Sequence, residues 1–512
     1  RKSDSTQPNS AEPHLPGTVV ECHDMIRQLQ LSHVQVMQRL SELEERLKLN
    51  SRNSSKPPSS DGPEVPTRAP RPKSGKRLGG QPGHPGSFRA MVPIEQTQAQ
   101  VVCPPPEHCE RCGADVQGDP DKPIRHQVFE LPQIEPLITE YVRLRGVCSG
   151  CGLKHHGALP VGVPTGQLGA RALALVGTLA GQFHLTQRKV QAVLSHIMGI
   201  RFSLGAVSQA HGLVAQGLAK PVAQLHTQLQ HAPVCHADET RHQSHAHTLW
   251  AWALVSDWGA KFAIDPSRGQ LAAKLVLGEQ PRFVTVSDRY AGYNYLTLEQ
   301  RQVCWAHLLR DFERIAGRSG LAGQIGKRLL AYGFLLFRWR GQDKGAQHFS
   351  WLQKRIRAQL ELATAQTQCS RTANTCANLI KMWPALWTFS RNPLVPPTNN
   401  AAEQALRGWV IKRKLSYFTR SGRGMRFWET IMSTVQTCAM QGRFTFEYVG
   451  ESIQSWLAGQ PPPGESRRLR GRSIWSPSCH SCRTRPSATH HRLRADPGAG
   501  PGNRQRRRPR AR

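Results

Sequence analysis

Two aspartates stand directly after strand-like runs, and this feature constrains the fold more than any other. The apolar run Pro233 to Ala237 is followed by Asp238, and the run RFVTVS is followed by Asp288. Two further strands, Thr248 to Ser256 and Lys261 to Asp265, are predicted between them by their alternating apolar residues. Burying a carboxylate at the end of a core strand is costly, so both aspartates are candidate functional residues.

The order of the predicted elements indicates the fold class. Three meander strands are followed by a helical stretch containing QLAAKLVLG, the strand before Asp288, a further helical stretch, a fifth strand at Gln302 to Trp305, and the helix AHLLRDFERI. This order predicts an α/β fold with a ribonuclease H-like catalytic core. In open α/β sheets, polar groups at strand ends gather at a shared edge. We therefore expect Asp238 and Asp288 to face each other.

A third carboxylate is needed to complete a site for a hard cation, and TNNAAEQALRGWVIKRK supplies a candidate. Asn400 can cap a helix that begins at Ala401, which places Glu403 in the first turn, facing the sheet edge. The same pattern also fits a plain capping box, with an i,i+4 pair between Glu403 and Arg407. The pattern alone does not decide between the two interpretations.

Composition narrows the classes of partner and compartment. The chain has 512 residues and a net charge of +33, which indicates a polyanionic partner, with nucleic acid the first candidate. No signal peptide or membrane span is recognisable, so we expect a cytoplasmic protein. Its 13 cysteines are dispersed and odd in number, which argues against a disulfide framework.

The first hundred residues divide into a helix and a linker. A 3.5-residue apolar repeat within residues 1–49 predicts a short coiled coil. One heptad position holds Ile26, His33, Leu40 and Leu47, and the other holds Leu29, Val36 and Leu43. A single amphipathic helix packed on its own domain fits the same repeat. Residues 50–98 are rich in Ser, Pro, Gly, Lys and Arg, which predicts a flexible basic linker.

Residues 99–165 contain two Cys-x2-Cys pairs, each followed by glycine. Four thiolates in this spacing predict a structural zinc ribbon, and the glycines let backbone amides turn towards the sulfurs of Cys109, Cys112, Cys148 and Cys151. In residues 166–230, one helix starts after the N-cap Thr186 and stops at Gly199, and a second starts at Ser203. Such a pair is either a DNA-reading helix-turn-helix or ordinary helix packing.

Taken together, several motifs resemble one known family. The segments DET at Asp238, SDRYAGY at Asp288, CWAHLLRDF, NNAAEQALR followed by KRK, and the N-terminal NSRNSSKPPSSDG and GGQPGHPG are similar, in order and content, to the insertion sequence 66 family of DDE transposases. The resemblance implies that Asp238, Asp288 and Glu403 form a catalytic triad that binds Mg²⁺ or Mn²⁺. It implies a catalytic domain at residues 231–457 with a mostly helical insertion at about 320–391.

The resemblance also implies partners. These are the terminal inverted repeats of the element and target DNA, with a homo-oligomer and accessory proteins of the same element as further expectations. Thr398 and Gln404 depart from the residues that the family usually has there. Residues 458–512 become Arg-rich and resemble nothing in the family, which favours a frameshifted 3′ end over a genuine basic DNA-binding tail.

Basic residues beside the triad are the candidate DNA contacts. Lys412, Arg413 and Lys414 follow Glu403 on the same predicted helix, and with Arg407 they could hold phosphates near the scissile bond. A solvated basic helix face is the alternative. His307, just after the fifth strand, could contact the metal site or DNA, or simply pack at a helix start. The rival to an active transposase is a catalytically inactive, zinc-containing DNA-binding protein derived from one.

Overall fold

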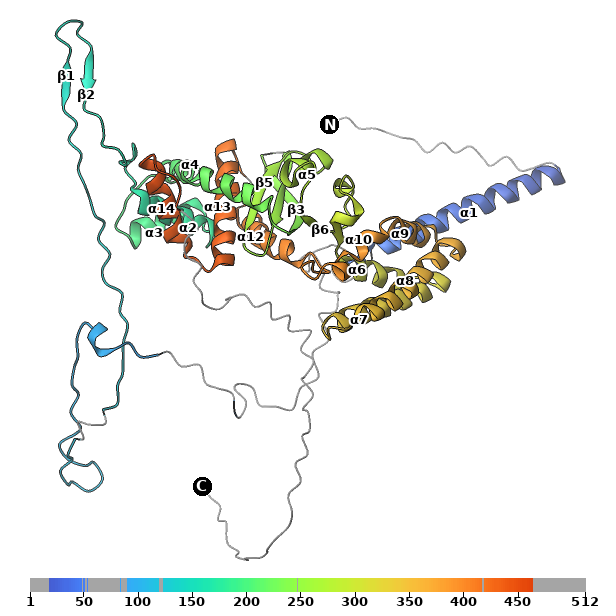
Figure 1. Cartoon of the computed structure of the whole chain (residues 1–512), viewed down its shortest axis with the longest axis horizontal. Coiled ribbons are helices and arrows are strands. Elements are labelled where there is room, and N and C mark those ends of the chain that lie inside the picture. Colours follow the sequence, from blue (N-terminus) through green and yellow to red (C-terminus); the bar gives the residue numbers. More distant parts are fainter. Residues whose placement is uncertain are drawn as a thin grey trace, which may run out of the picture.

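The computed structural model describes residues 18–47, 49–50, 53, 83, 90–118, 123–245, 247–416 and 419–463. The Arg-rich tail and most of the predicted linker lie outside these residues. Figure 1 shows a globular part with a long helix at one end and an extended segment at the other. No helix in the described residues is long and apolar enough to cross a lipid bilayer.

A five-stranded mixed sheet forms the centre of the globular part, in the order β5-β4-β3-β6-β7. Strands β3, β4 and β5 pair antiparallel, whereas β6 pairs parallel to both β3 and β7. The strands are β3 (Val234–Ser244), β4 (His247–Val255), β5 (Ala260–Asp265), β6 (Val284–Ser287) and β7 (Arg301–Val303). The predicted order of strands is confirmed. Between β6 and β7, however, the chain forms two short 3₁₀ turns, η3 (Ala291–Tyr293) and η4 (Leu298–Gln300), instead of the predicted helix.

Both faces of the sheet are covered, and the alternation along β4 shows how. Ala251, Ala253 and Val255 belong to one hydrophobic cluster, while Trp252 and Leu254 between them belong to another. Successive side chains of a strand point to opposite faces, so a continuous apolar run is the pattern of a strand buried on both sides. The second cluster includes α5 (Gln270–Leu277).

Helices from the N-terminal and the C-terminal segments of the globular part contribute to the first cluster. They pack on β4 and β5 and on one another, and include α2 (Ala170–Gly181), α3 (Gln187–His196), α4 (Leu204–Leu229), α12 (Asn400–Ser416), α13 (Gly422–Gln441) and α14 (Thr445–Leu457). Thr186 accepts a hydrogen bond from the Lys189 amide and Ser203 from the Ala206 amide, so both predicted helix starts are confirmed. Helix α4 is buried along much of its length, so packing in the core is sufficient to explain its apolar sequence. DNA reading by this helix pair stays a prediction.

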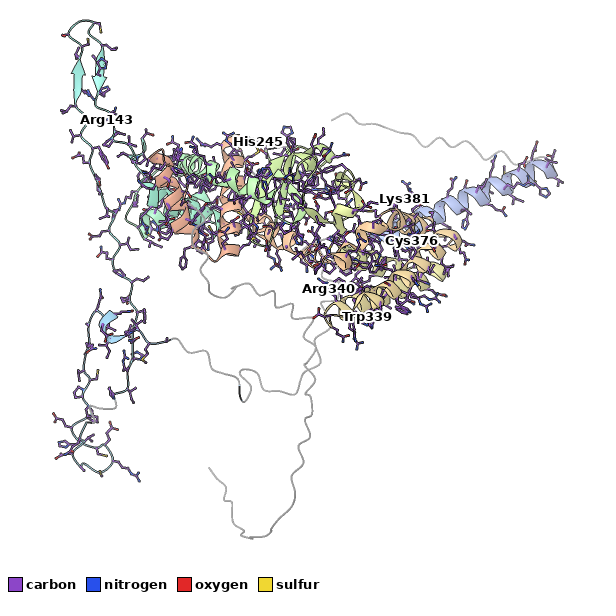
Figure 2. The ribbon with its side chains drawn as sticks, in the orientation of Figure 1. Arg143, His245, Trp339, Arg340, Cys376 and Lys381 are labelled. Atoms are coloured by element: carbon purple, nitrogen blue, oxygen red, sulfur yellow. The ribbon has the colours of Figure 1, made fainter. Side chains whose placement is uncertain are left out.

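A helical insertion separates β7 from α12. Helix α6 (Trp305–Ala316) leads into α7 (Gly320–Arg340), α8 (Ala346–Gln366), α9 (Ser370–Lys381), α10 (Trp383–Leu386) and α11 (Thr388–Arg391). These helices share a cluster with β6 and β7 that includes Val286, Val303 and Trp305. Figure 2 labels Trp339, Arg340, Cys376 and Lys381 on this insertion, well away from His245 at the β3–β4 turn. The predicted helical insertion therefore packs against the β6–β7 end of the sheet.

The N-terminal helix and the cysteine-containing segment project from this core, and the end of the helix at Glu44 lines a pocket together with Glu313 of α6 and Arg318 after it. Helix α1 (Val19–Leu47) holds the predicted heptad repeat, and its apolar side chains are exposed, with Leu29 at 63% and Val36 at 56%. The coiled coil stays a prediction, because no second chain is present. In the described residues between η2 (Ile94–Gln96) and α2, the chain forms a tight turn at each cysteine pair and the hairpin of β1 (Arg145–Val147) and β2 (Lys154–His156), and otherwise contains no helix or strand. Figure 2 shows the side chains around Arg143 on this segment standing free of the globular part.

Candidate active site

Asp238 lies within β3, not at its end. The parallel pairing of β3 with β6 stops at His236, whereas the antiparallel pairing with β4 continues to Ser244. The predicted strand end is therefore wrong, because β3 continues beyond its pairing with β6 by pairing with its hairpin partner β4. Asp238 nevertheless lies just beyond the parallel pairing, two residues after His236. Its Oδ1 accepts a hydrogen bond of 2.9 Å from the Glu239 amide.

Asp288 follows β6 directly, as predicted. Its Oδ1 accepts a 2.9 Å hydrogen bond from the Tyr290 amide, and its backbone carbonyl accepts one of 2.8 Å from Arg301 Nη2. Arg301 is almost fully buried, so it fixes the backbone at the end of β6 from inside the protein. The neighbouring Arg289 pairs with Asp311 on α6 and not with the Asp288 carboxylate.

Glu403 lies in the first turn of α12, as predicted, but the helix is anchored differently. Helix α12 begins at Asn400, so Asn399 and not Asn400 precedes it. The buried Asn399 side chain donates a 2.8 Å hydrogen bond to the Ala237 carbonyl and contacts His236 Nδ1 at 3.1 Å. These bonds fasten the start of α12 beside β3, next to Asp238. Within the described residues no ion pair joins Glu403 to Arg407, which is exposed.

Asp238 interacts electrostatically with both other carboxyls of the predicted triad. The pKa of Asp238 is raised well above its usual value, first by burial and then by the charges of Glu239, Asp288 and Glu403. No lysine or arginine in the described residues forms a salt bridge with Asp238, Asp288 or Glu403. Like charges gathered without a counter-ion repel one another, and a bound cation relieves that repulsion. Aspartate and glutamate oxygens are the ligands that Mg²⁺ and Mn²⁺ prefer, so this donor set suits a hard divalent ion.

Asp238→Asn should stabilise the metal-free protein at pH 7 by on the order of 1 kcal/mol, given that one pKa unit corresponds to about 1.4 kcal/mol. A raised pKa means that the folded state favours the protonated acid, so wild-type stability is lost as the pH rises through that pKa. Below the unfolded-state pKa of about 3.9 the side chain is neutral in both states and the difference should vanish, so it should already be smaller at pH 4.5 than at pH 7. Urea unfolding in chelator at pH 7 and pH 4.5 measures this. The exposed turn residue Asp257 gives the control Asp257→Asn, and equal effects of the two variants would refute the prediction.

Glu239 is buried beside the site but is neutralised within the protein. Its Oε1 accepts hydrogen bonds from Arg268 at 2.7 and 2.8 Å, and its Oε2 accepts one of 2.6 Å from the Tyr293 hydroxyl. The Arg268 guanidinium lies 3.9 Å from the centre of the Tyr290 ring. Both oxygens of Glu239 are thus engaged, which excludes it from the set of free carboxylates and makes it a support for the backbone at Asp238.

His307 and Cys304 adjoin the third carboxylate. Cys304 directly follows β7 and its amide donates to the Ser287 carbonyl at 2.9 Å, while His307 lies in the first turn of α6. His307 Nδ1 is 3.6 Å from Glu403 Oε1, which is beyond hydrogen-bonding distance. Of the two roles considered for His307, contact with the carboxylate site is therefore the one that its position favours.

Comparison with known proteins decides the family. The family described as "Transposase IS66 family" matches residues 165–427, more than half of the chain. The chain belongs to the IS66 family of transposases. The match covers the sheet, the insertion and the first helices of the globular part, and all three carboxylates lie inside it. Residues 10–90 match a second family, described as a family of unknown function (DUF6444).

This IS66 family transposase is also similar to a curated protein. It is 27% identical over 182 residues to the uncharacterized protein y4qI of Sinorhizobium fredii, strain NBRC 101917 / NGR234. The match covers 31% of this chain and 31% of that protein, so the chain spans about a third of its relative.

The basic residues of the transposase are divided between its surface and its interior. Arg407 and Lys414 are exposed on α12. Lys412 is only 3% exposed and lies over the Trp428 ring at 4.4 Å, and burial lowers its pKa to about 8. This burial fits neither interpretation given above for Lys412, a phosphate contact or a solvated helix face. Arg413 is half-buried and donates to the Thr240 hydroxyl at 3.2 Å and the Arg241 carbonyl at 2.7 Å.

The two cysteine pairs form matching turns that are not joined. The Gly113 amide donates to the Cys109 carbonyl and the Gly152 amide to the Cys148 carbonyl, with φ of +74° and +71° at the two glycines. Backbone amides near each turn lower the pKa of Cys109, through Arg111 first, and of Cys148, through Cys151 first. In the described residues, however, the four sulfurs do not come within metal-sharing distance of one another. The zinc ribbon stays a prediction.

Three supporting residues escaped the sequence interpretation. Asn399 lies in the quoted TNN motif, and a buried amide before a helix can be recognised only from its partners on β3. The burial of Glu239 depends on Arg268 and Tyr293, which are distant in sequence. Cys304 precedes His307 by three residues, and this Cys-x2-His spacing was the available signal.

Proposed function

We propose that this IS66 family member cleaves DNA at the ends of its element and joins the freed ends to target DNA. The observation that carries the proposal is the electrostatic interaction of Asp238 with Asp288 and Glu403 beside the parallel part of the sheet, with no lysine or arginine of the described residues in a salt bridge to any of the three. The strand order and the place of the carboxylates fit a ribonuclease H-like core. A DDE triad would then be assembled from β3, the end of β6 and the start of α12.

The three carboxylates would hold Mg²⁺ or Mn²⁺, which supplies activation of the attacking oxygen and stabilisation of the leaving oxygen in phosphoryl transfer. The protein's own contribution is positioning. The Glu239 amide holds one carboxylate oxygen of Asp238, and the Tyr290 amide holds one of Asp288. Asn399 fixes the helix that carries Glu403. Water would be the nucleophile in cleavage, and the freed 3′ hydroxyl in joining.

Exposed cations beside the triad would bind the DNA backbone. Arg407 and Lys414 are available to phosphates without rearrangement, and His307 lies next to Glu403. Lys412 and Arg413 would instead hold α12 against α13 and β3. Contacts to phosphates supply affinity without sequence preference, so recognition of the element ends would need other parts of the chain.

Purified protein incubated with labelled DNA that carries both ends of its own element, with Mn²⁺, tests the proposal. We expect nicks at the element ends and, with added target DNA, joined products. Binding without any cleavage would support the rival function, an inactive DNA-binding protein. A chelator control and a DNA of scrambled end sequence separate specific cleavage from contaminating nuclease.

The cysteine turns would bind zinc if the segment between them folds back. Each turn already presents backbone amides to a pair of sulfurs, which is the local arrangement of a zinc knuckle. Cys109→Ser or Cys148→Ser should therefore lower the zinc content of the full chain by one equivalent, measured by elemental analysis after dialysis. The exposed spare thiol gives the control Cys103→Ser, which should leave the content unchanged. Unchanged zinc in both knuckle variants would exclude a shared site.

A further inference from the structure

We propose that Cys304, His307 and Glu403 form a binding site for a thiophilic or borderline divalent cation such as Zn²⁺, which adjoins the hard-cation site of the triad and shares Glu403 with it. One potential ligand atom of each residue, Sγ, an imidazole nitrogen and a carboxylate oxygen, lies within 4.8 Å of the others. These three residues come from the end of β7, the start of α6 and the start of α12. The site thus joins two helix starts that are separated by the whole insertion.

The state of the individual atoms points to a missing ligand. His307 Nδ1 and Glu403 Oε1 are both shielded from solvent and have no hydrogen-bond partner. Buried polar atoms in proteins are nearly always paired, so each such atom requires an explanation. Two unpaired electron-pair donors that face each other at 3.6 Å, beside a cysteine sulfur, are explained together by one cation between them.

The donor types define the class of cation. Sulfur and imidazole ligands favour zinc and related ions, whereas Mg²⁺ and Mn²⁺ prefer carboxylate, carbonyl and water oxygens. Three protein ligands would leave a fourth position of a tetrahedral ion for water. The backbone amide of Asn399 already donates to Cys304 Sγ at 3.1 Å, an interaction that holds the sulfur of a metal-binding cysteine in place.

The consequence for the triad rests on the proposed function. A cation on Glu403 Oε1 would fix the carboxylate and leave its second oxygen free for the hard-cation site shared with Asp238. Cys304 and His307 would then be positioning residues for Glu403. Binding of the cation itself does not depend on whether the protein cleaves DNA.

Cobalt is the probe, because Co²⁺ bound to a thiolate gives a near-ultraviolet charge-transfer band and intense visible bands. The full chain with Cys109, Cys112, Cys148 and Cys151 changed to serine removes the knuckles and should still show the thiolate band with one equivalent of Co²⁺. Adding Cys304→Ala should abolish the band. Cys376→Ala, at another buried cysteine on α9, is the matched control and should leave the band intact.

Two further variants keep the test decisive. Should Cys304→Ala fail to fold by circular dichroism, His307→Gln keeps the thiolate and is expected to weaken cobalt binding by more than about tenfold, a loss that even changes outside the metal ligands can cause. Asp238→Asn should bind cobalt normally although it lacks cleavage, so failure of the proposed function would leave this result unaffected. Absence of the band in the knuckle-free protein, its persistence in Cys304→Ala, or undiminished affinity in His307→Gln would each overturn the proposal.

Discussion

Replacing Asp238, Asp288 or Glu403 by alanine is expected to lower DNA cleavage by roughly a thousandfold or more while the protein stays folded and bound to DNA. Residues that act as one unit lose nearly all activity when any member is removed, so the three single variants should be about equally impaired. Binding should persist because the exposed cations on α12 are untouched. Cleavage of labelled element-end DNA with Mn²⁺, together with a gel-shift assay, measures both properties.

The matched control for the triad is Glu313→Ala, which removes an exposed carboxylate from α6. It should cleave at the wild-type rate. A triad variant that retains cleavage would show that its residue is not part of the site, and a variant that loses binding as well would indicate misfolding. Double variants should be no worse than single ones, a non-additivity that distinguishes a shared site from independent contributions.

Asn399→Ala should destabilise the protein by about 2–4 kcal/mol, because it leaves two buried groups unpaired at a cost of about 1–3 kcal/mol each. The groups are the Ala237 carbonyl and the His236 ring, which Asn399 contacts at 2.8 and 3.1 Å. The same change loosens the start of α12, so cleavage should fall by up to about a hundredfold, the effect expected from a displacement of roughly 1 Å. Urea unfolding and cleavage rates measure the two effects.

The neighbouring asparagine provides the control for this prediction. Asn400 is exposed and is the first residue of α12, so Asn400→Ala changes the same residue type without breaking the link to β3. It should shift stability by less than about 0.5 kcal/mol, as is usual for surface changes. A positioning role for Asn399 also predicts that the variant needs more Mn²⁺ for half-maximal cleavage. An unchanged metal requirement would limit Asn399 to stability.

Local signals in the sequence predicted much of this fold. The strands of the sheet and the starts of α3 and α4 were recognisable because apolar alternation and N-cap residues act over a few positions. Asp288 was placed correctly because its strand ends in sequence and in space at the same residue. Glycines after the cysteine pairs predicted tight turns, and both adopt the positive φ that favours glycine.

Features that depend on distant partners were not predictable in the same way. The run after Asp238 has the polarity of a turn, yet it continues as a strand because β4 pairs with it up to Ser244. Lys412 was grouped with its basic neighbours, although it lies three residues after the buried Trp409 on one face of α12. Helical spacing could have placed it on the buried side. No spacing could have shown that Asn399 would reach the backbone of β3.

The link between Asn399 and β3 has a consequence for the time at which the site forms during protein synthesis. The bond to Ala237 joins residues 162 positions apart, and the ribosome needs on the order of ten to thirty seconds to add that many at roughly 5–20 residues per second. By the end of that interval the nascent chain has Asp238 and Asp288 but still lacks Glu403. A ribosome-bound chain arrested before α12 should therefore cleave no DNA, because the proposed triad is incomplete until α12 has been made.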